Sequence, residues 1–180
     1  YDGQSDVVTR LHGGQDRTWV SISELQPNTV YAFISAEDAR FFEHEGVDVI
    51  RIAGAIVADI KAGSYVQGAS TISQQLIKLS HLTSEKTISR KAEEAALAYE
   101  MERHYSKEDI LEMYLNYVYF GGGYYGIEAA AEGYFGVHAS DLTLDQSAML
   151  AGILKSPSGY APHINYAASI NRRNNILRLM

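Results

Sequence analysis

Two acidic residues stand at the start of a short aromatic segment. Glu37 and Asp38 follow Ser35, a residue type that often begins a helix, and they precede Phe41 and Phe42. Carboxylates in a first helical turn commonly complement the helix dipole. A carboxylate beside apolar rings instead has its charged form disfavoured and its pKa raised, which suits a general base acting on a hydroxyl near neutral pH. The residues alone leave both interpretations open.

Three polar side chains share one face of a helix that we expect over residues 72–79. Thr71, Gln75 and Lys78 are spaced at i, i+4 and i+7, and apolar residues occupy the adjoining face. The segment before them, 68–70, leads into a helix N-terminus whose free amides favour an anion. This pattern indicates a phosphate or diphosphate site. The alternative is a solvated helix face that begins with an ordinary Ser70 cap.

A basic group follows, made of Lys86, Arg90 and Lys91, with Glu94 one turn beyond Arg90. An exposed pair of this kind contributes little to stability and is the simpler explanation. The chain nevertheless has 15 basic and 22 acidic residues and a net charge of −7, so local positive charge opposes the overall balance. A small anionic ligand explains this better than a polyanion, and nucleic acid is not expected as a partner.

The remaining chemical residues point to few sites. The chain has no cysteine, which excludes disulfides, thiolate zinc sites and a cysteine nucleophile. Its six histidines show no metal-binding spacing, and His44 is expected to be a structural hydrogen-bonding residue. The tyrosines within 114–125 are expected to line the core and a groove, with sugar stacking as the alternative.

The elements that must position these residues are mainly α-helical. Start and stop signals predict helices at 36–43, 49–62, 72–79, 84–103, 107–117, 144–154 and 171–180. Residues 1–34 contain β-rich runs at 7–8, 19–22 and 30–34, so we expect an extended or β-strand lead-in packed on the domain. Glycines between 121 and 136 indicate close packing around tyrosines.

Size and composition bound the architecture. The 180 residues are 46% hydrophobic and 21% charged, which is typical of a globular chain with a single core. No run of 18 apolar residues occurs. The sequence begins at Tyr1 and stops within a helical pattern, so we expect a piece of a longer protein.

These segments together resemble the peptidoglycan glycosyltransferases, family 51, of class A penicillin-binding proteins and monofunctional transglycosylases. The resemblance covers residues 31–180. The family's motif E-D-x-x-F-x-x-H-x-G stands at 37–46, G-x-S-T-I-x-Q-Q-L-x-K-N at 68–79, R-K-x-x-E at 90–94, and the fourth and fifth motifs at 107–136 and 148–160. Leu79 stands where the family usually has Asn, and Leu154 replaces a common proline.

The resemblance implies a mainly α, lysozyme-like fold of two lobes, with one glycosyltransferase domain over 35–180. It implies that lipid-linked disaccharide-peptide and a growing glycan strand are the substrates, joined by a β-1,4 bond with inversion and release of polyprenyl diphosphate. By this similarity Glu37 is the general base and Glu94 supports the donor side. The family's substrate-binding and supporting positions are Asp38, Phe41, His44, Ser70, Thr71, Gln75, Lys78, Arg90, Lys91 and Lys155.

The resemblance also implies a setting for the domain. No tightly bound cofactor is expected, although a divalent cation (Mg²⁺ or Mn²⁺) has a place near the diphosphate beside Glu94. Residues 47–67 correspond to a part that contacts the bilayer surface, on the extracytoplasmic face of a bacterial membrane, with a transpeptidase domain in the full-length protein. The alternative for 49–60 is an ordinary amphipathic core helix, whereas an interfacial helix would expose Ile50 and Val57.

Two rival functions remain. A lysozyme-like hydrolase or lytic enzyme would protonate the glycosidic oxygen and would not need a diphosphate-binding face, which Thr71, Gln75 and Lys78 supply. A catalytically inactive binding module for glycan or lipid carrier would not need both Glu37 and Glu94.

Overall fold

The computed structural model describes residues 18–63, 68–81 and 87–180. These form helices α1 (Pro27–Glu37), α2 (Val49–Ala62), α3 (Ile72–His81), α4 (Ile88–Glu102), α5 (Lys107–Tyr117), α6 (Ile127–Phe135), α7 (Leu144–Ile153), α8 (Pro157–Tyr160) and α9 (Tyr166–Leu179). Short 3-10 turns lie at Ile22–Glu24, Phe41–Glu43 and Ala139–Asp141. No strand occurs in these three ranges, only isolated bridges. The prediction of a mainly α fold is confirmed.

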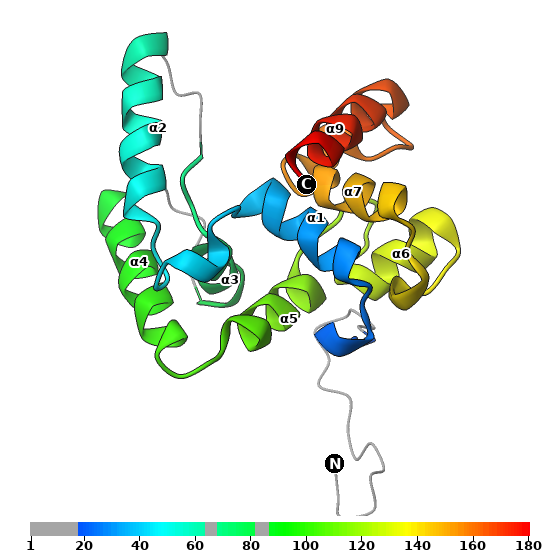
Figure 1. The fold of residues 1–180 in the computed structure, drawn as a ribbon, viewed down its shortest axis with the longest axis horizontal. Coiled ribbons are helices and arrows are strands. Elements are labelled where there is room, and N and C mark those ends of the chain that lie inside the picture. Colours follow the sequence, from blue (N-terminus) through cyan, green and yellow to red (C-terminus); the bar gives the residue numbers. More distant parts are fainter. Residues whose placement is uncertain (1–17, 64–67, 82–86) are drawn as a thin grey trace, which may run out of the picture.

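The helices fall into two groups. Figure 1 shows α2, α3 and α4 at one end of the molecule and α6, α7 and α9 at the other, with α1 and α5 between them. Helix α3 packs on α4 and α5, whereas α7 contacts α1 and α9. This arrangement agrees with the two-lobed, lysozyme-like helical fold expected from the sequence.

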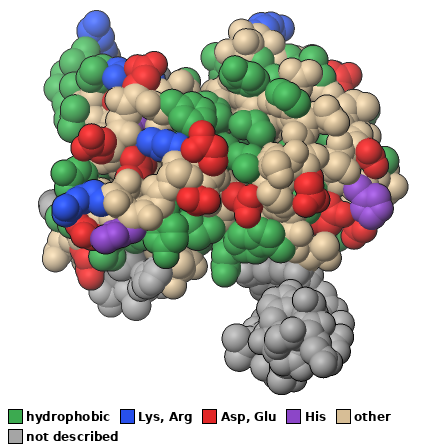
Figure 2. Space-filling view, turned by 60° about the horizontal axis from the view of Figure 1, so that its bottom comes forward, with side chains coloured by type: hydrophobic (Ala, Val, Ile, Leu, Met, Phe, Trp, Pro, Cys, Tyr) green, Lys and Arg blue, Asp and Glu red, His purple; other side chains and the backbone are tan. Residues whose placement is uncertain are grey.

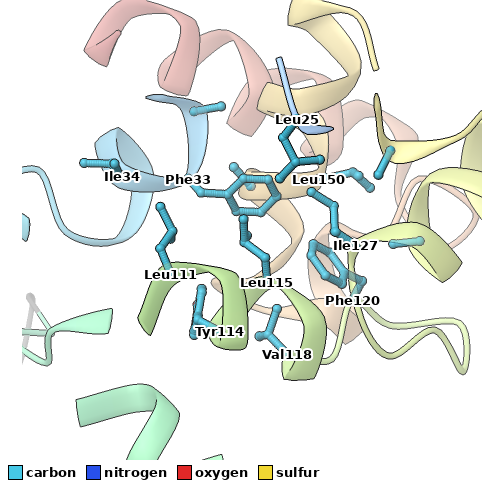
Figure 3. Close-up of a cluster of buried hydrophobic side chains, with 14 of the residues drawn as sticks. Leu25, Phe33, Ile34, Leu111, Tyr114, Leu115, Val118, Phe120, Ile127 and Leu150 are labelled. Carbon is cyan, nitrogen blue, oxygen red and sulfur yellow. The ribbon is translucent and has the colours of Figure 1, made fainter. Parts of the chain in front are cut away.

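The hydrophobic core lies where α1, α5 and α7 meet. Figure 3 shows Phe33 of α1, Leu115 of α5 and Leu150 of α7 converging there. Every residue of α7 from Ser147 to Ile153 is buried, which explains why residues 148–153 carry no polar side chain on any face. A buried hydrogen bond of 2.8 Å between the hydroxyls of Thr29 and Ser147 joins α1 to α7.

Several helix ends match their sequence signals. Asp48 caps α2, which ends at Gly63 in the left-handed region, and reciprocal capping boxes begin α5 at Ser106 and α7 at Thr143. Tight packing of glycine on tyrosine is also confirmed, because a Cβ at Gly133 would lie 2.2 Å from the ring of Tyr124.

Two expectations near the N-terminus are wrong. The β-rich run 30–34 lies inside α1, which begins with Pro27 at its first position and buries Ala32, Phe33 and Ile34 against the core. The helix expected at 36–43 is replaced by the end of α1 and a 3-10 turn at Phe41–Glu43. Burial in a helical layer decided these segments, not local β propensity.

The rest of the expected lead-in is extended only in part. Residues 18–21 have no regular structure, and Asn116 of α5 holds Val20 by accepting from its backbone N at 2.9 Å and donating to its carbonyl at 2.8 Å. The run at 7–8, Ser84 and Lys86 lie outside the described residues.

Helix α2 differs from the others in its exposure. Ala55 is its single buried residue, while Val49, Ile50, Ile56, Val57 and Ile60 are exposed. Figure 2 shows apolar side chains on the surface at the end of the molecule that holds α2. The alternative that 49–60 is an ordinary core helix is therefore wrong. Among the described helices, none has the length and apolar character needed to cross a bilayer.

Candidate active site

Glu37 is the last residue of α1, and its carboxylate faces α3. Oε2 accepts a hydrogen bond of 3.0 Å from Nε2 of Gln75, whose Oε1 in turn accepts one of 3.1 Å from the hydroxyl of Tyr114 on α5. The amide of Gln75 is therefore held from both sides and presents a fixed donor to the carboxylate. Three helices contribute one residue each to this chain of hydrogen bonds.

The surroundings of Glu37 favour its protonated form. Burial raises the pKa of the Glu37 carboxyl above its usual range, and the nearby Asp38 carboxylate adds to this. The hydrogen bond from Gln75 and the charges of Arg172 and Arg51 oppose the pKa shift without cancelling it. A carboxylate with a raised pKa is a better proton acceptor near neutral pH than an ordinary surface glutamate.

Tyr114 is fully buried behind this pair. Burial and the carboxylates of Glu37 and Asp38 raise the pKa of the Tyr114 hydroxyl well above its ordinary value near 10. The phenol therefore keeps its proton at neutral pH and acts as a donor to Gln75.

Asp38 ties the first motif to the second. Its side chain is buried, and Oδ2 accepts from Nε2 of His44 at 2.9 Å and from the backbone N of Ile72 at 3.0 Å. Since Ile72 is the first residue of α3, Asp38 provides a carboxylate at that helix N-terminus. The predicted supporting residues Asp38 and His44 thus make their polar contacts within the protein.

Phe41 and His44 lie beside Asp38, and His44 contacts it directly. Phe41 is buried in the core, with its ring centroid 6.1 Å from that of His44. Nζ of Lys107 lies 4.5 Å from the centre of the Phe41 ring and 3.5 Å from Nδ1 of His44. Lys107 also pairs with Glu102 at 2.7 Å. Binding of substrate by Phe41 or His44 stays a prediction.

The second motif begins α3 with a reciprocal cap. Oγ1 of Thr71 accepts from the backbone N of Gln74, and Oε1 of Gln74 accepts from the backbone N of Thr71, each at 3.1 Å. The Thr71 hydroxyl also donates to the carbonyl of Gly46 at 2.6 Å. A Cβ at Gly46, where φ is 83°, would lie 2.6 Å from the backbone N of Tyr99, so only glycine fits there.

The polar face predicted on α3 is not uniformly accessible. Thr71 is completely buried, Gln75 is half-buried against Glu37, and Lys78 is exposed. Thr71 is therefore positioned as a capping residue, and Lys78 is the residue of this group that reaches solvent. A substrate-binding role for each of them stays a prediction.

A second charged group connects α4 to the segment before α3. Glu94 is buried, pairs with Nζ of Lys91 and lies 4.0 Å from Nη1 of Arg90. Nζ of Lys91 also donates to Oγ of Ser70 at 2.7 Å. The structure thus brings together four predicted site residues, namely Ser70, Arg90, Lys91 and Glu94. Lys155, exposed just after α7, makes no hydrogen bond or ion pair with them in the described ranges.

Two further residues near Glu37 were not predicted from the sequence. Arg51 donates to the backbone carbonyl of Glu37 from the first turn of α2, and Arg172 adds its charge from α9. Gly152 makes room for Arg172, since a Cβ there would lie 3.0 Å from Cγ of the arginine. Neither arginine has a spacing that connects it to Glu37 along the chain, so the sequence offers no local signal for them.

The charged group at Glu94 offers a poor site for a divalent cation. The carboxylate of Glu94 is already paired with Lys91 and lies near Arg90, a donor set that does not fit a divalent cation. Within the described residues the one group with suitable spacing is Glu128, Glu132 and His138. Glu128 there accepts from Nδ1 of His138 at 2.7 Å and from the backbone N of Ala139 at 2.8 Å, which is a cap for the turn at Ala139–Asp141.

The chain is similar to known proteins over nearly its whole length. The Transglycosylase family profile matches residues 4–180. The chain is 47% identical to penicillin-binding protein 2D and 50% identical to penicillin-binding protein 1A/1B, both of Bacillus subtilis (strain 168), each over 100% of the chain and over 26% and 20% of those proteins. It is 43% identical to penicillin-binding protein 1A of Aquifex aeolicus (strain VF5), over 97% of the chain and 24% of that protein. The chain thus spans about a quarter or less of the length of these relatives, and it belongs to the transglycosylase family.

Proposed function

We propose that this chain is a peptidoglycan glycosyltransferase domain that polymerises lipid-linked disaccharide-peptide into β-1,4 glycan strands with inversion. The observation that carries the proposal is the half-buried Glu37 carboxylate, which has a raised pKa and is oriented by Gln75. A family whose members extend glycan strands needs one base of this kind, aimed at a hydroxyl.

In the proposed glycosyl transfer, Glu37 acts as the general base. Its carboxylate takes the proton of the acceptor's 4-hydroxyl as that oxygen forms a bond to C1 of the donor sugar. The bond from C1 to the diphosphate oxygen breaks on the opposite face, and polyprenyl diphosphate leaves with the electron pair. Inversion at C1 follows from attack opposite the leaving group. The base must be ionised for this step, so we expect kcat/KM to fall as pH drops through the raised pKa of Glu37.

Basic side chains have the complementary role at the leaving group. Nε and Nη1 of Arg90 are buried without hydrogen-bond partners in the described residues, so this guanidinium has unused donors. Lys78 is exposed on α3, and Lys91 reaches Ser70. Fixed cations stabilise the charge that develops on a departing diphosphate. We assign Glu94 to the orientation of Arg90 and Lys91, and we derive no step through a metal ion because the donor set does not fit one.

The exposed face of α2 suggests how the domain meets a lipid-linked substrate. We assign the apolar side chains of that helix to the surface of a bilayer, on the extracytoplasmic face of a bacterial membrane. Since the chain covers about a quarter of its penicillin-binding relatives, we also propose a longer protein with a transpeptidase domain.

The test compares the chain with its Glu37→Gln variant on lipid-linked disaccharide-peptide in detergent, with products separated by length. We expect long strands from the wild type and a loss of at least about 100-fold in rate for Glu37→Gln, because a positioned general base contributes about 10²–10⁴-fold. Glu45→Gln, a substitution of an exposed glutamate in the same segment, serves as the control and should retain the wild-type rate.

Each alternative has its own outcome in this assay. Wild-type turnover by Glu37→Gln would remove that residue as the base. Shortened glycan would support a lysozyme-like hydrolase, and substrate binding without any product would support an inactive binding module.

A further inference from the structure

Arg51 lies at the base of α2 and contacts three backbone or side-chain groups of the two site motifs. Nη1 donates to the backbone carbonyl of Glu37 and lies 3.6 Å from Oδ1 of Asp38. Nη2 donates to the carbonyl of Gly68 at 3.3 Å. One guanidinium therefore joins the end of α1 to the segment that leads into Ser70.

The backbone of Arg51 is itself fixed. Asp48, the N-cap of α2, accepts from the backbone N of Arg51 at 2.8 Å, and Asp48 is buried 3.5 Å from Nε of Arg40. The guanidinium thus extends from the best-anchored turn of a helix that otherwise buries only Ala55. This makes Arg51 a main link between α2 and the first motif.

The contacts of Arg51 satisfy groups that have few other partners. A carbonyl in the last turn of a helix receives no hydrogen bond from an N–H of that helix, and Glu37 is the last residue of α1. Oδ1 of the buried Asp38 has no hydrogen bond, so the nearby charge of Arg51 compensates for its burial. The planar fork of arginine reaches two carbonyls at once, which the single ammonium of lysine does not reproduce.

We infer that Arg51 is a positioning residue for Glu37, one that fixes the backbone of the proposed base relative to the loop at Gly68 and couples both to the base of α2. The inference rests on the proposed role of Glu37. Arg51 acts through Glu37 and is not assigned a contact with substrate. A small displacement of a catalytic group is enough to lower a rate by about 100-fold.

The charges around Glu37 determine what the loss of Arg51 should do to its titration. Gln75 on α3, Arg172 on α9 and Arg51 on α2 lower the pKa of Glu37, whereas burial and Asp38 raise it, and the neutral phenol of Tyr114 lies behind Gln75. Removing the charge of Arg51 therefore raises the pKa of Glu37 further. Lysine at 51 keeps the charge but loses the fork.

The kinetic test measures kcat and KM against pH for the wild-type chain, Arg51→Gln, Arg51→Lys and the control Arg103→Gln. Arg103 is an exposed arginine at the C-terminal end of α4, where it pairs with Glu100 at 3.2 Å. We expect kcat to fall by at least about tenfold in both Arg51 variants with a smaller change in KM. The acidic limb of the profile should move to higher pH in Arg51→Gln, and Arg51→Lys and Arg103→Gln should keep the wild-type limb.

A second readout does not depend on turnover. The ¹³C carboxyl signal of Glu37, assigned by its absence in Glu37→Gln, should titrate at higher pH in Arg51→Gln than in wild type and be unchanged in Arg103→Gln. If the wild type makes no strands, the proposed function fails while this titration still tests Arg51.

Two results would overturn the inference. One is a Glu37 titration and a pH profile that are the same in Arg51→Gln and wild type. The other is a loss of activity in the Arg51 variants that matches the unfolded fraction measured by melting. Should Arg51→Gln fail to fold, Arg51→Lys carries the kcat comparison alone, and wild-type kcat in that variant would contradict the need for a fork.

Discussion

At the scale of single residues, the burial that raises the pKa of Glu37 also lowers the stability of the folded chain at neutral pH. The pKa of its carboxyl is raised in the folded chain, so the ionised form is less favourable there than in the unfolded chain. Below the unfolded pKa, near 4.5, both states are protonated and no free energy of unfolding is lost. As pH rises from that value through the folded pKa, the unfolded state releases its proton first and stability falls.

Glu37→Gln should therefore be at least as stable as wild type at pH 7, because glutamine is neutral and can still accept from Gln75. The advantage should shrink towards zero as pH is lowered below about 4.5, the pKa of an unperturbed glutamate. Urea unfolding at several pH values measures it, with Glu45→Gln as the exposed control. A Glu37→Gln chain less stable than wild type at pH 7 would show that the ionised carboxylate of Glu37 does not destabilise the folded state.

The sequence identified Glu37 as a candidate but left two interpretations of it open, and it did not identify the partners of that carboxylate. The structure favours the raised pKa, because burial disfavours the charged form. Phe41, the first aromatic residue after Glu37 in the sequence, is itself buried in the core. Gln75 and Tyr114 hold the carboxylate through contacts 38 and 39 residues apart in sequence, and no periodic pattern encodes contacts of that separation.

At the scale of elements, Thr71 shows that a site motif can be a structural cap. Its hydroxyl bridges the backbone N of Gln74 and the carbonyl of Gly46, both in a buried setting. Thr71→Ala should lower the free energy of unfolding by about 1–3 kcal/mol, since buried groups are left unpaired. Denaturant unfolding measures this, and Thr71→Ser, which keeps the hydroxyl, should recover most of the loss. Equal losses in both variants would place the effect in the methyl group's packing.

Helix ends were predictable where a cap is local, as at Asp48, Ser106 and Thr143. They were not predictable at α1, where Ser35 resembles an N-cap but lies within the last turn of a helix that began at Pro27. The β-rich run at 30–34 favours a strand locally, yet it lies within α1 and places Phe33 between side chains of α5 and α7.

At the scale of the whole molecule, the fold places an apolar helix face and the proposed base on connected elements. Val49, Ile50, Val57 and Ile60 are each more than half exposed on α2, while Arg51 in the first turn of that helix contacts the carbonyl of Glu37. Exposed apolar surface of this extent marks a contact site for an apolar partner, and we propose that this partner is the bilayer surface.

Replacing Ile50 and Val57 with Ser should therefore weaken binding to anionic phospholipid vesicles without unfolding the chain. Burial of one side chain of this size contributes about 1.5–3 kcal/mol, so losing two should reduce vesicle affinity by roughly tenfold or more even when burial is incomplete.

Flotation of vesicles measures the bound fraction. The melting temperature should hardly change, because the two side chains are 60% and 51% exposed and support little of the core. Leu144→Ser, at an exposed position on α7, is the matched control and should float like wild type. Unchanged flotation of the double variant would mean that the apolar face of α2 contacts something other than lipid.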